Sequence, residues 1–250
     1  MNLQDYYLVK LFKKNEYRYG FDSGSYIRIN SMKSFWNIEN PFQQDYEGKV
    51  FGQTGRGFLF AGNPNFGDKL KNYSSIEEII TDLHNNGTEV SETTDMTIRV
   101  DGYIVCFYLL PRKSVQFENN RMMFNDDNEK TKFSIFLQRY YKENGAFYGS
   151  IYNSEQFCNI FFKIMKSHNY RICYGKVTYL KISSDDKIRW LQNGELKKIV
   201  FTKPESYSYQ NEFRIFLMAD EKNDRDYIEE KAYGIHLSVI GQFDNNSFSQ

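Results

Sequence analysis

The sequence predicts a single α+β domain, with mixed and mostly antiparallel central sheets and about three flanking helices. Three observations lead to this fold class. Runs rich in Tyr, Ile, Val and Phe occur along the chain, segments with helical spacing lie between them, and no internal repeat or linker divides the 250 residues. A chain of this length buries a core without disulfide support. Because aromatic residues make up 18% of the chain, we expect that core to consist largely of rings.

The N-terminal part predicts two strands followed by a long loop. Residues 6–12 form an apolar run that Lys10 interrupts. Residues 26–30 alternate, so Ile27 and Ile29 are expected on one face, and Tyr26, Arg28 and Asn30 on the other. Residues 31–48 show no period and contain aromatic and acidic side chains, which is typical of a functional loop.

The middle of the chain predicts helices around one buried strand. Residues 75–86 begin with a capping box and carry apolar residues at helical spacing. Residues 102–110 form a continuous apolar run closed by Pro111, which predicts a strand that is buried on both faces. A polar loop is expected at 119–130. Two further helices are expected, one from Phe133 to near Gly145 and one that begins at Ser154.

The C-terminal part is expected to supply most of the sheet. The predicted strands are 171–174, 177–182, 199–202, 210–217 and 235–240. Asn193 and Gly194 favour a hairpin turn. Residues 220–231 are expected to form a charged loop, and the tail from about 243 to 250 is expected to fray.

Composition and charge exclude several classes of function. Lys plus Arg and Asp plus Glu are balanced at 32 each, so a nucleic-acid partner needs a local basic groove. Three histidines without metal-site spacing argue against a zinc or non-haem iron centre. Residues 1–15 lack the apolar core of a signal peptide, and the longest apolar run is too short to span a bilayer. We therefore expect a cytoplasmic protein with no membrane partner.

The three cysteines lie far apart in apolar runs, and we interpret them as reduced core residues. Catalysis by a cysteine is the alternative. Five glycines between 52 and 67 fit neither the dinucleotide fingerprint nor the P-loop, so they are interpreted as turn residues. Asp185 and Asp186 precede Glu195 and Lys197 in a loose metal-nuclease pattern, for which a solvated hairpin is the simpler interpretation.

The most informative stretch is 203–217, a polar loop that leads into a strand. Alternation predicts that Gln210, Glu212 and Arg214 share one face of this strand, with apolar residues on the other. Such a polar face is costly to bury without partners, so it must look into water, a cleft or a ligand. An edge strand with one solvated face is the alternative.

Short motifs in this part of the chain resemble a large bacterial family. They are Val177-Thr178-Tyr179, Lys203-Pro204 and Gln210-Asn211-Glu212-Phe213-Arg214, with Ile104-Val105-Cys106-Phe107 as a cysteine-bearing strand. At the N-terminus, residues 24–31 and 45–48 are similar to the entry strands and acidic loop of the same group. More distantly, the arrangement resembles ADP-ribosyltransferases of bacterial toxins and phage-defence systems, including the DarT type.

This resemblance implies an ADP-ribosyltransferase-like fold with NAD as the substrate. It implies that Lys10 meets the NAD phosphates or ribose, and that Arg28 and Ser31 bind NAD from the second strand. It also implies that Glu212 is the catalytic acid. Gln210 stands where the family more often has Glu at a position that touches the acceptor, so the acceptor is left open between nucleic acid and protein. A regulatory partner such as an antitoxin is also implied.

The chemistry gives further roles to nearby residues. Breaking the nicotinamide–ribose bond builds positive charge on the ribose, which a fixed Glu212 carboxylate stabilises. The candidate pyrophosphate clamps are Lys10, Arg28 and Arg214, and the candidate stacking rings are Tyr26, Phe35 and Trp36. The candidate substrate-binding residues are Asp45, Glu47 and Lys203. The alternative interpretation is that the arginines form surface pairs with the acids and that the rings belong to the core.

Four functions are therefore open on the sequence: an NAD-dependent ADP-ribosyltransferase, an NAD hydrolase, a non-enzymatic binding domain that uses residues 35–48, and a metal-dependent nuclease. Glu212→Ala separates the enzymatic hypotheses from the others. We expect that substitution to abolish activity without loss of folding, because an exposed acid in a cleft contributes little to stability.

Overall fold

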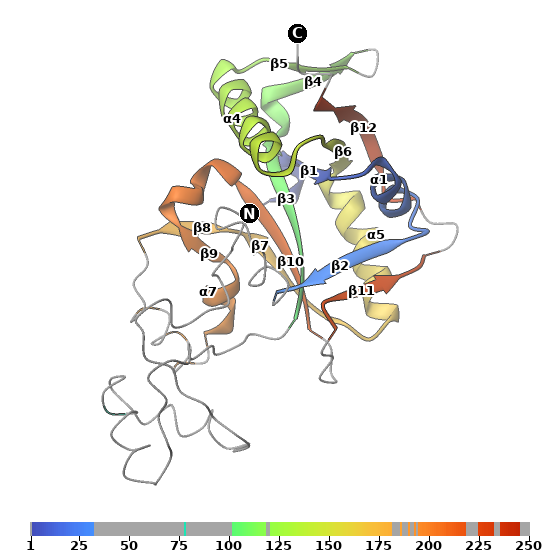
Figure 1. The fold of residues 1–250 in the computed structure, drawn as a ribbon, viewed down its shortest axis with the longest axis vertical. Helices are drawn as coiled ribbons and strands as arrows, with labels where there is room; N and C mark the ends of the chain where they lie inside the picture. Colours follow the sequence, from blue (N-terminus) through green and yellow to red (C-terminus); the bar gives the residue numbers. More distant parts are fainter. Residues whose placement is uncertain are drawn as a thin grey trace.

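The computed structural model describes residues 2–32, 78, 102–118, 121–181, 186, 190, 193, 195–218, 225–232 and 236–245. In this part the chain forms one α+β arrangement around a large antiparallel sheet (Figure 1). The strands are β1 (Tyr6–Phe12), β2 (Ile27–Ser31), β3 (Tyr103–Pro111), β4 (Val115–Glu118), β5 (Arg121–Phe124), β6 (Tyr148–Asn153), β7 (Arg171–Lys176), β8 (Thr178–Leu180), β9 (Thr202–Pro204), β10 (Glu212–Met218), β11 (Tyr227–Glu230) and β12 (Val239–Asp244).

Four α-helices are described, together with three short 3-10 turns. The helices are α1 (Asn15–Asp22), α4 (Asp127–Asn144), α5 (Ser154–Ser167) and α7 (Leu196–Val200), and the turns are η1 (Leu3–Asp5), η5 (Arg112–Ser114) and η6 (Glu205–Gln210). None of the helices in the described ranges is both long enough and apolar enough to cross a membrane.

The main sheet runs in the order β11-β2-β3-β1-β6-β12, and β10 and β7 continue it from β3. Two small ribbons accompany it, the antiparallel pair β4–β5 and the parallel pair β8–β9. Figure 1 shows β3 and β10 side by side through the middle of the molecule, with β2 and β11 to one side. Five of the eight strands of the main sheet, namely β6, β7, β10, β11 and β12, lie in the C-terminal half, as predicted, and β1, β2 and β3 come from the N-terminal half.

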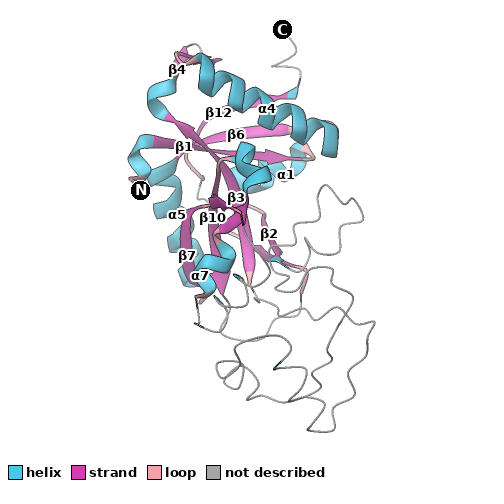
Figure 2. Ribbon diagram, turned by 90° about the vertical axis from the view of Figure 1, so that its left-hand side faces the viewer, coloured by secondary structure: helices cyan, strands magenta, loops and turns pink. Residues whose placement is uncertain are grey.

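Alternation along β3 and β10 divides the core between the two faces of the sheet. Phe107, Phe213 and Ile215 point into one cluster, which α5 covers with Phe157 and Phe161. The other face carries two smaller clusters, one under α4 and one beside α7. Figure 2 shows α4 lying across the end of the sheet that contains β1 and β6. This second face, between α4 and α7, is the one that holds the candidate site.

The sheet is split along one edge of β3. β1 pairs with β3 only up to Val9, which lies opposite Tyr108. β2 pairs with β3 only at Asn30 and Ser31, opposite Ile104 and Tyr103. Between these two pairings, β1 and β2 leave residues 105–107 of β3 without a strand on that side, although β10 pairs with them on the other. The chain from Lys10 to Ile29 thus leaves β3 and returns to it, while the end of β1 stays paired with β6 and the start of β2 with β11.

Several predicted elements are confirmed. β1, β2, β3 and β7 match predicted strands, and the alternation at 27–30 is confirmed because Ile27 and Ile29 are buried while Arg28 and Asn30 are exposed. α5 begins at Ser154 as expected. α4 ends before Gly145, whose positive φ of 75° suits a glycine.

Other predictions were wrong, for identifiable reasons. The loop expected at 119–130 contains β5 and the first turn of α4, because Asp126 caps that helix by accepting from the backbone N–H groups of Asn128 and Glu129. The strand expected at 199–202 begins in the helix α7, which ends at Val200, and β9 begins only at Thr202. Residues 186 and 190 are also helical, so the described residues around Asn193 do not support the hairpin.

Several short elements were not predicted, and the last strand begins later than expected. α1, β4 and β6 have no predicted counterpart, and β11 lies within the expected loop 220–231. The last strand is β12, which begins four residues later than predicted. Phe243 is buried in the α4 cluster and does not fray. The loop at 31–48 lies outside the described residues beyond Met32, as do the glycines between 52 and 67 and Asp185. Of the helix predicted at 75–86, only Glu78 is described, and it is helical.

Candidate functional site

A cleft of about 560 Å³ opens where β1 and β2 separate from β3. This volume lies within the range of about 300–1,000 Å³ that is typical of small-molecule sites. We call it the central cleft. Its walls come from β1, β2, β3, α1, α4, β9, η6 and the start of β10. The polar and charged side chains that matter for its chemistry are Lys10, Arg28, Cys106, Lys203, Gln210 and Glu212.

Glu212 is the most tightly held acid of the cleft. It is the first residue of β10 and is only 4% exposed. Its Oε1 lies 2.6 Å from Arg214 Nε, and its Oε2 lies 2.8 Å from Lys203 Nζ. Burial by itself raises the pKa of Glu212, but the charges of Arg214 and Lys203 outweigh burial and lower this pKa to about 2. The carboxylate is therefore ionised throughout the physiological pH range.

Arg214 supports Glu212 from behind. The two residues are two positions apart in β10 and so share one face of the strand. Arg214 is 1% exposed and does not line the cleft. Its Nη1 donates to the carbonyl of Val200, the last residue of α7, where a cation also complements the helix dipole. The guanidinium thus joins β10 to α7 and fixes the orientation of the carboxylate.

Lys203 approaches Glu212 from β9 and lies at the cleft wall. Its Nζ donates to Gln210 Oε1 at 2.7 Å as well as contacting Glu212. β9 is held in place by its parallel pairing with β8, in which Lys203 lies opposite Tyr179. The Tyr179 hydroxyl in turn accepts the backbone N–H of Glu212 at 2.9 Å. The β8–β9 ribbon therefore positions both a cation and a hydroxyl against the start of β10.

Gln210 does not lie in the strand, contrary to the prediction. It ends η6, and Asn211 follows in the left-handed conformation with φ of 36°. Asn tolerates this conformation better than most residues, and its side-chain Nδ2 donates to the carbonyl of Leu109 at 2.7 Å. The alternation assumed from 210 to 214 is thereby broken. Gln210 reaches the same cluster through Lys203 and not through a shared strand face.

Lys10 and Cys106 meet at the opening in the sheet. Lys10 Nζ lies 5.3–5.5 Å from the ring centroids of Phe12, Phe21 and Phe107, within cation–π range. Burial lowers the pKa of Lys10, and the nearby Cys106 and Glu212 oppose this shift. Cys106 lies opposite Arg214 in the β3–β10 register, and burial together with Glu212 raises the pKa of its thiol well above the usual value. The thiol is therefore neutral.

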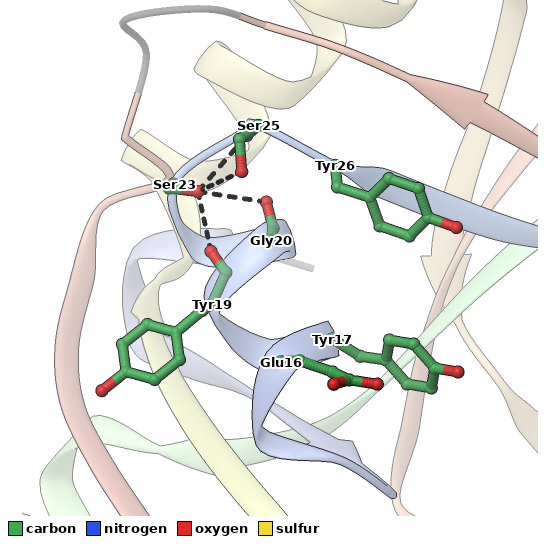
Figure 3. A pocket seen from close by; sticks show the side chains of 7 residues that line it. All are labelled: Glu16, Tyr17, Tyr19, Gly20, Ser23, Ser25 and Tyr26. Carbon is green, nitrogen blue, oxygen red and sulfur yellow. Dashed lines mark hydrogen bonds between the residues drawn. The ribbon is translucent and has the colours of Figure 1, made fainter.

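On the β2 side, the rim of the cleft contains aromatic rings and side chains that contact residues of β11. The Arg28 guanidinium lies 3.7 Å from the ring centroid of Tyr227, and the Tyr26 hydroxyl donates to Glu229 Oε1. A second, more open pocket of about 590 Å³ adjoins this rim and shares Tyr17 and Tyr26 with the central cleft. Figure 3 shows both rings extending toward the same side, with Glu16 beside Tyr17.

The structure brings together six of the residues singled out from the sequence, since Lys10, Tyr26, Arg28, Lys203, Gln210 and Glu212 all line the central cleft. Arg214 lies behind it. Ser31 is buried at the β2–β3 pairing and does not line the central cleft. Phe35, Asp45 and Glu47 lie outside the described residues. The surface-pair interpretation of Arg214 and the exposed-acid description of Glu212 were both wrong, because both side chains are buried.

Sequence reasoning missed the contribution of α4 and of Cys106. Phe136, Tyr140, Glu143 and Asn144 line the cleft from one face of α4. The signal for that face was present in the spacing of these residues, which recur three to four positions apart. Cys106 was assigned to the core from its apolar neighbours. Its position in the cleft follows from the split of the sheet, which strand patterns do not encode.

The described residues contain no group of three or more His, Cys, Asp or Glu side chains that could hold a metal ion. They therefore give no support to the metal-dependent nuclease. Glu195, one acid of the nuclease-like pattern, forms an ion pair with Lys198 at 2.8 Å. All three cysteines are free, as predicted.

No protein-family model, curated protein or solved structure matches this chain significantly.

Proposed function

We propose that this chain is an NAD-consuming enzyme of the ADP-ribosyltransferase type that acts in the central cleft. The observation that carries the proposal is the convergence of Lys10 from β1, Arg28 from β2 and Glu212 from β10 on one cleft. These three strands are far apart in sequence, and the motif resemblance implies a role in NAD chemistry for the same three residues. The proposal includes a toxin- or defence-type role, which rests on the motif resemblance, and a cytoplasmic location, which rests on the sequence features described above.

The residues of the cleft fit the chemical parts of NAD. Lys10 and Arg28 are cations suited to the pyrophosphate, since charge-assisted hydrogen bonds are the strong ones. Tyr140 and Tyr207 add rings to the wall, on which the planar ends of a dinucleotide can stack. Glu212 supplies a fixed carboxylate for the ribose. Because its pKa is lowered to about 2, this carboxylate acts as an electrostatic stabiliser and hydrogen-bond acceptor, not as a proton donor at neutral pH.

The reaction follows from these roles. The bond between the ribose anomeric carbon and the nicotinamide nitrogen breaks, and its electron pair leaves with nicotinamide. Positive charge on the ribose is stabilised by the Glu212 carboxylate. A nucleophile of the acceptor forms the new bond to the anomeric carbon and loses its proton to solvent. Water in that position gives free ADP-ribose, so hydrolysis and transfer share the same first step.

Incubation of the purified chain with NAD labelled in the adenylate part tests the proposal. Label that moves to protein or nucleic acid in an added cell extract indicates transfer, whereas label recovered as ADP-ribose indicates hydrolysis. We expect one of the two, together with release of nicotinamide. Glu212→Gln keeps the size of the side chain and removes its charge, so it should reduce either signal by at least about 100-fold. NAD that stays intact both with and without the extract would refute the proposal.

A further inference from the structure

Among the described residues, several cations gather around the Glu212 carboxylate. Three cationic side chains interact with it electrostatically or directly, namely Lys10, Lys203 and Arg214. The Cys106 thiol beside them is neutral. Glu143, a further carboxylate at the cleft wall within the described residues, lies on α4 and interacts with Arg139 of the same helix. Glu212 is therefore a carboxylate that more than one cation shares in a poorly solvated place, where the arrangement of charges has a large effect on free energy.

The two cations in direct contact with Glu212 differ in how they are held. Arg214 is anchored at both ends, because its Nε and Nη2 contact the carboxylate while its Nη1 donates to the backbone of α7. Lys203 reaches Glu212 with a single rotatable ammonium. Lys203 also lines the cleft, and Arg214 does not. A ligand in the cleft can therefore reach Lys203 without disturbing Arg214.

The pairing with Lys203 also limits what Glu212 can do. A carboxylate that already contacts two cations has little charge left to stabilise a third positive centre. A phosphoryl group offers Lys203 more negative charge than one carboxylate does, and it makes strong charge-assisted hydrogen bonds with an ammonium. Gln210 Oε1 also accepts from Nζ, at 2.7 Å, so the Lys203 ammonium is not held by Glu212 alone.

We propose that Lys203 is an exchangeable counter-ion, which leaves Glu212 Oε2 for a phosphoryl group when a phosphorylated ligand enters the central cleft. The role that we give to this exchange rests on the proposed function, because the exchange would free the Glu212 carboxylate to face the ribose. The exchange itself requires no NAD chemistry. Lys203 is thus a positioning residue, and its ligand class is the phosphoryl anion.

Binding of inorganic pyrophosphate, measured by titration calorimetry at low salt, tests the exchange independently of catalysis. We expect the wild-type chain to bind pyrophosphate and Lys203→Met to bind it at least 10-fold more weakly. Lys203→Gln is the second variant, because it keeps a polar group near Gln210 and is less disruptive if the Met variant does not fold. Lys113→Met is the matched control, since Lys113 is exposed on η5 and does not line the cleft.

The carboxyl ¹³C signal of Glu212 gives a second readout that a merely structural lysine would not move. In the wild-type chain, saturation with pyrophosphate should shift this signal and raise the pH at which it titrates, because Lys203 has left. In the Lys203 variants the free protein should already titrate higher, and pyrophosphate should change it less. Any of three results would overturn the proposed exchange. These are a wild-type chain that does not bind pyrophosphate, Lys203 variants that bind it within twofold of wild type, and a Glu212 signal that stays unmoved. Pyrophosphate binding that depends on Lys203 in a chain that leaves NAD intact would instead refute the proposed function alone.

Discussion

Arg214 Nε lies 2.6 Å from Glu212 Oε1, and both side chains are almost completely buried on the same face of β10. This contact turns an acid that sequence alone would leave in water into a buried, oriented carboxylate. It also ties the acid to the fold, since Arg214 continues to the backbone of α7. Function and stability therefore cannot be separated at this position by a simple truncation.

Glu212→Ala should lower the free energy of unfolding by about 3–5 kcal/mol, because it leaves Arg214 and Lys203 buried without their shared counter-ion. Urea denaturation of the two proteins measures the difference. Glu16→Ala is the control. Glu16 is an exposed acid 3.5 Å from Lys14, so its removal should change stability by about 1 kcal/mol or less. Equal effects of the two substitutions would contradict the buried ion pair.

The same pair predicts a loss of stability in acid. The pKa of Glu212 is about 2 in the folded chain, below the ordinary value of 4.5. A lowered pKa means that the unfolded chain binds the proton more readily, so the contribution of Glu212 is complete above pH 4.5 and is lost as the pH falls toward 2. Thermal unfolding of wild type and Glu212→Gln across this window should show the steeper decline in wild type. Parallel curves would contradict the assignment.

Lys10→Met should stabilise the chain at neutral pH. The ammonium lies among three phenyl rings, and no ion pair or hydrogen bond to its Nζ is found within the described residues. Burial lowers the pKa of Lys10 below 10.5, so the folded chain releases this proton before the unfolded chain does. The penalty in wild type is therefore full below the folded pKa and is relieved as the pH rises toward 10.5.

Melting temperatures measured from pH 7 to pH 10.5 test this prediction, with Lys113→Met as the control. The advantage of Lys10→Met should be largest at pH 7 and should shrink at alkaline pH. If the variant is instead less stable at pH 7, the cation–π contacts of the ammonium and its attraction to Glu212 outweigh the cost of burying it, which contradicts this prediction.

Cys106 should react slowly with thiol reagents and should be protected by a cleft ligand. Its thiol is neutral because its pKa is raised, and the thiolate is the reactive form. Peptide mass spectrometry after alkylation separates Cys106 from Cys173, which is partly buried but does not line the cleft. ADP-ribose should slow labelling of Cys106 several-fold and leave Cys173 unchanged. Identical protection of both would indicate a global effect and not occupancy of the cleft.

Much of this site could be predicted because period-two alternation places neighbouring strand residues reliably. The faces of β2 and the pairing of Glu212 with Arg214 follow from alternation alone. Gln210 could not be placed in this way, because the left-handed Asn211 breaks the strand before it begins. Single residues with unusual backbone conformation leave little trace in a hydrophobic pattern.

The burial of the site could not be predicted either, and the reason is topological. Whether a polar strand face is solvated depends on what covers it, and here the cover comes from α4, η6 and the β8–β9 ribbon. The position of Cys106 in the cleft depends likewise on β1 and β2 leaving β3 at different points. These are long-range pairings, and no local pattern in either strand records them.

Release of nicotinamide from NAD by the purified chain is the measurement that bears most directly on the central proposal. Wild-type chain should release nicotinamide, and Glu212→Gln, checked for retained folding by circular dichroism, should do so at least about 100-fold more slowly. Glu205→Gln, on exposed η6 nearby, should match wild type. A wild-type chain that leaves NAD intact, or a folded Glu212→Gln variant with undiminished release, would contradict the assignment of Glu212 as the acid that acts on NAD.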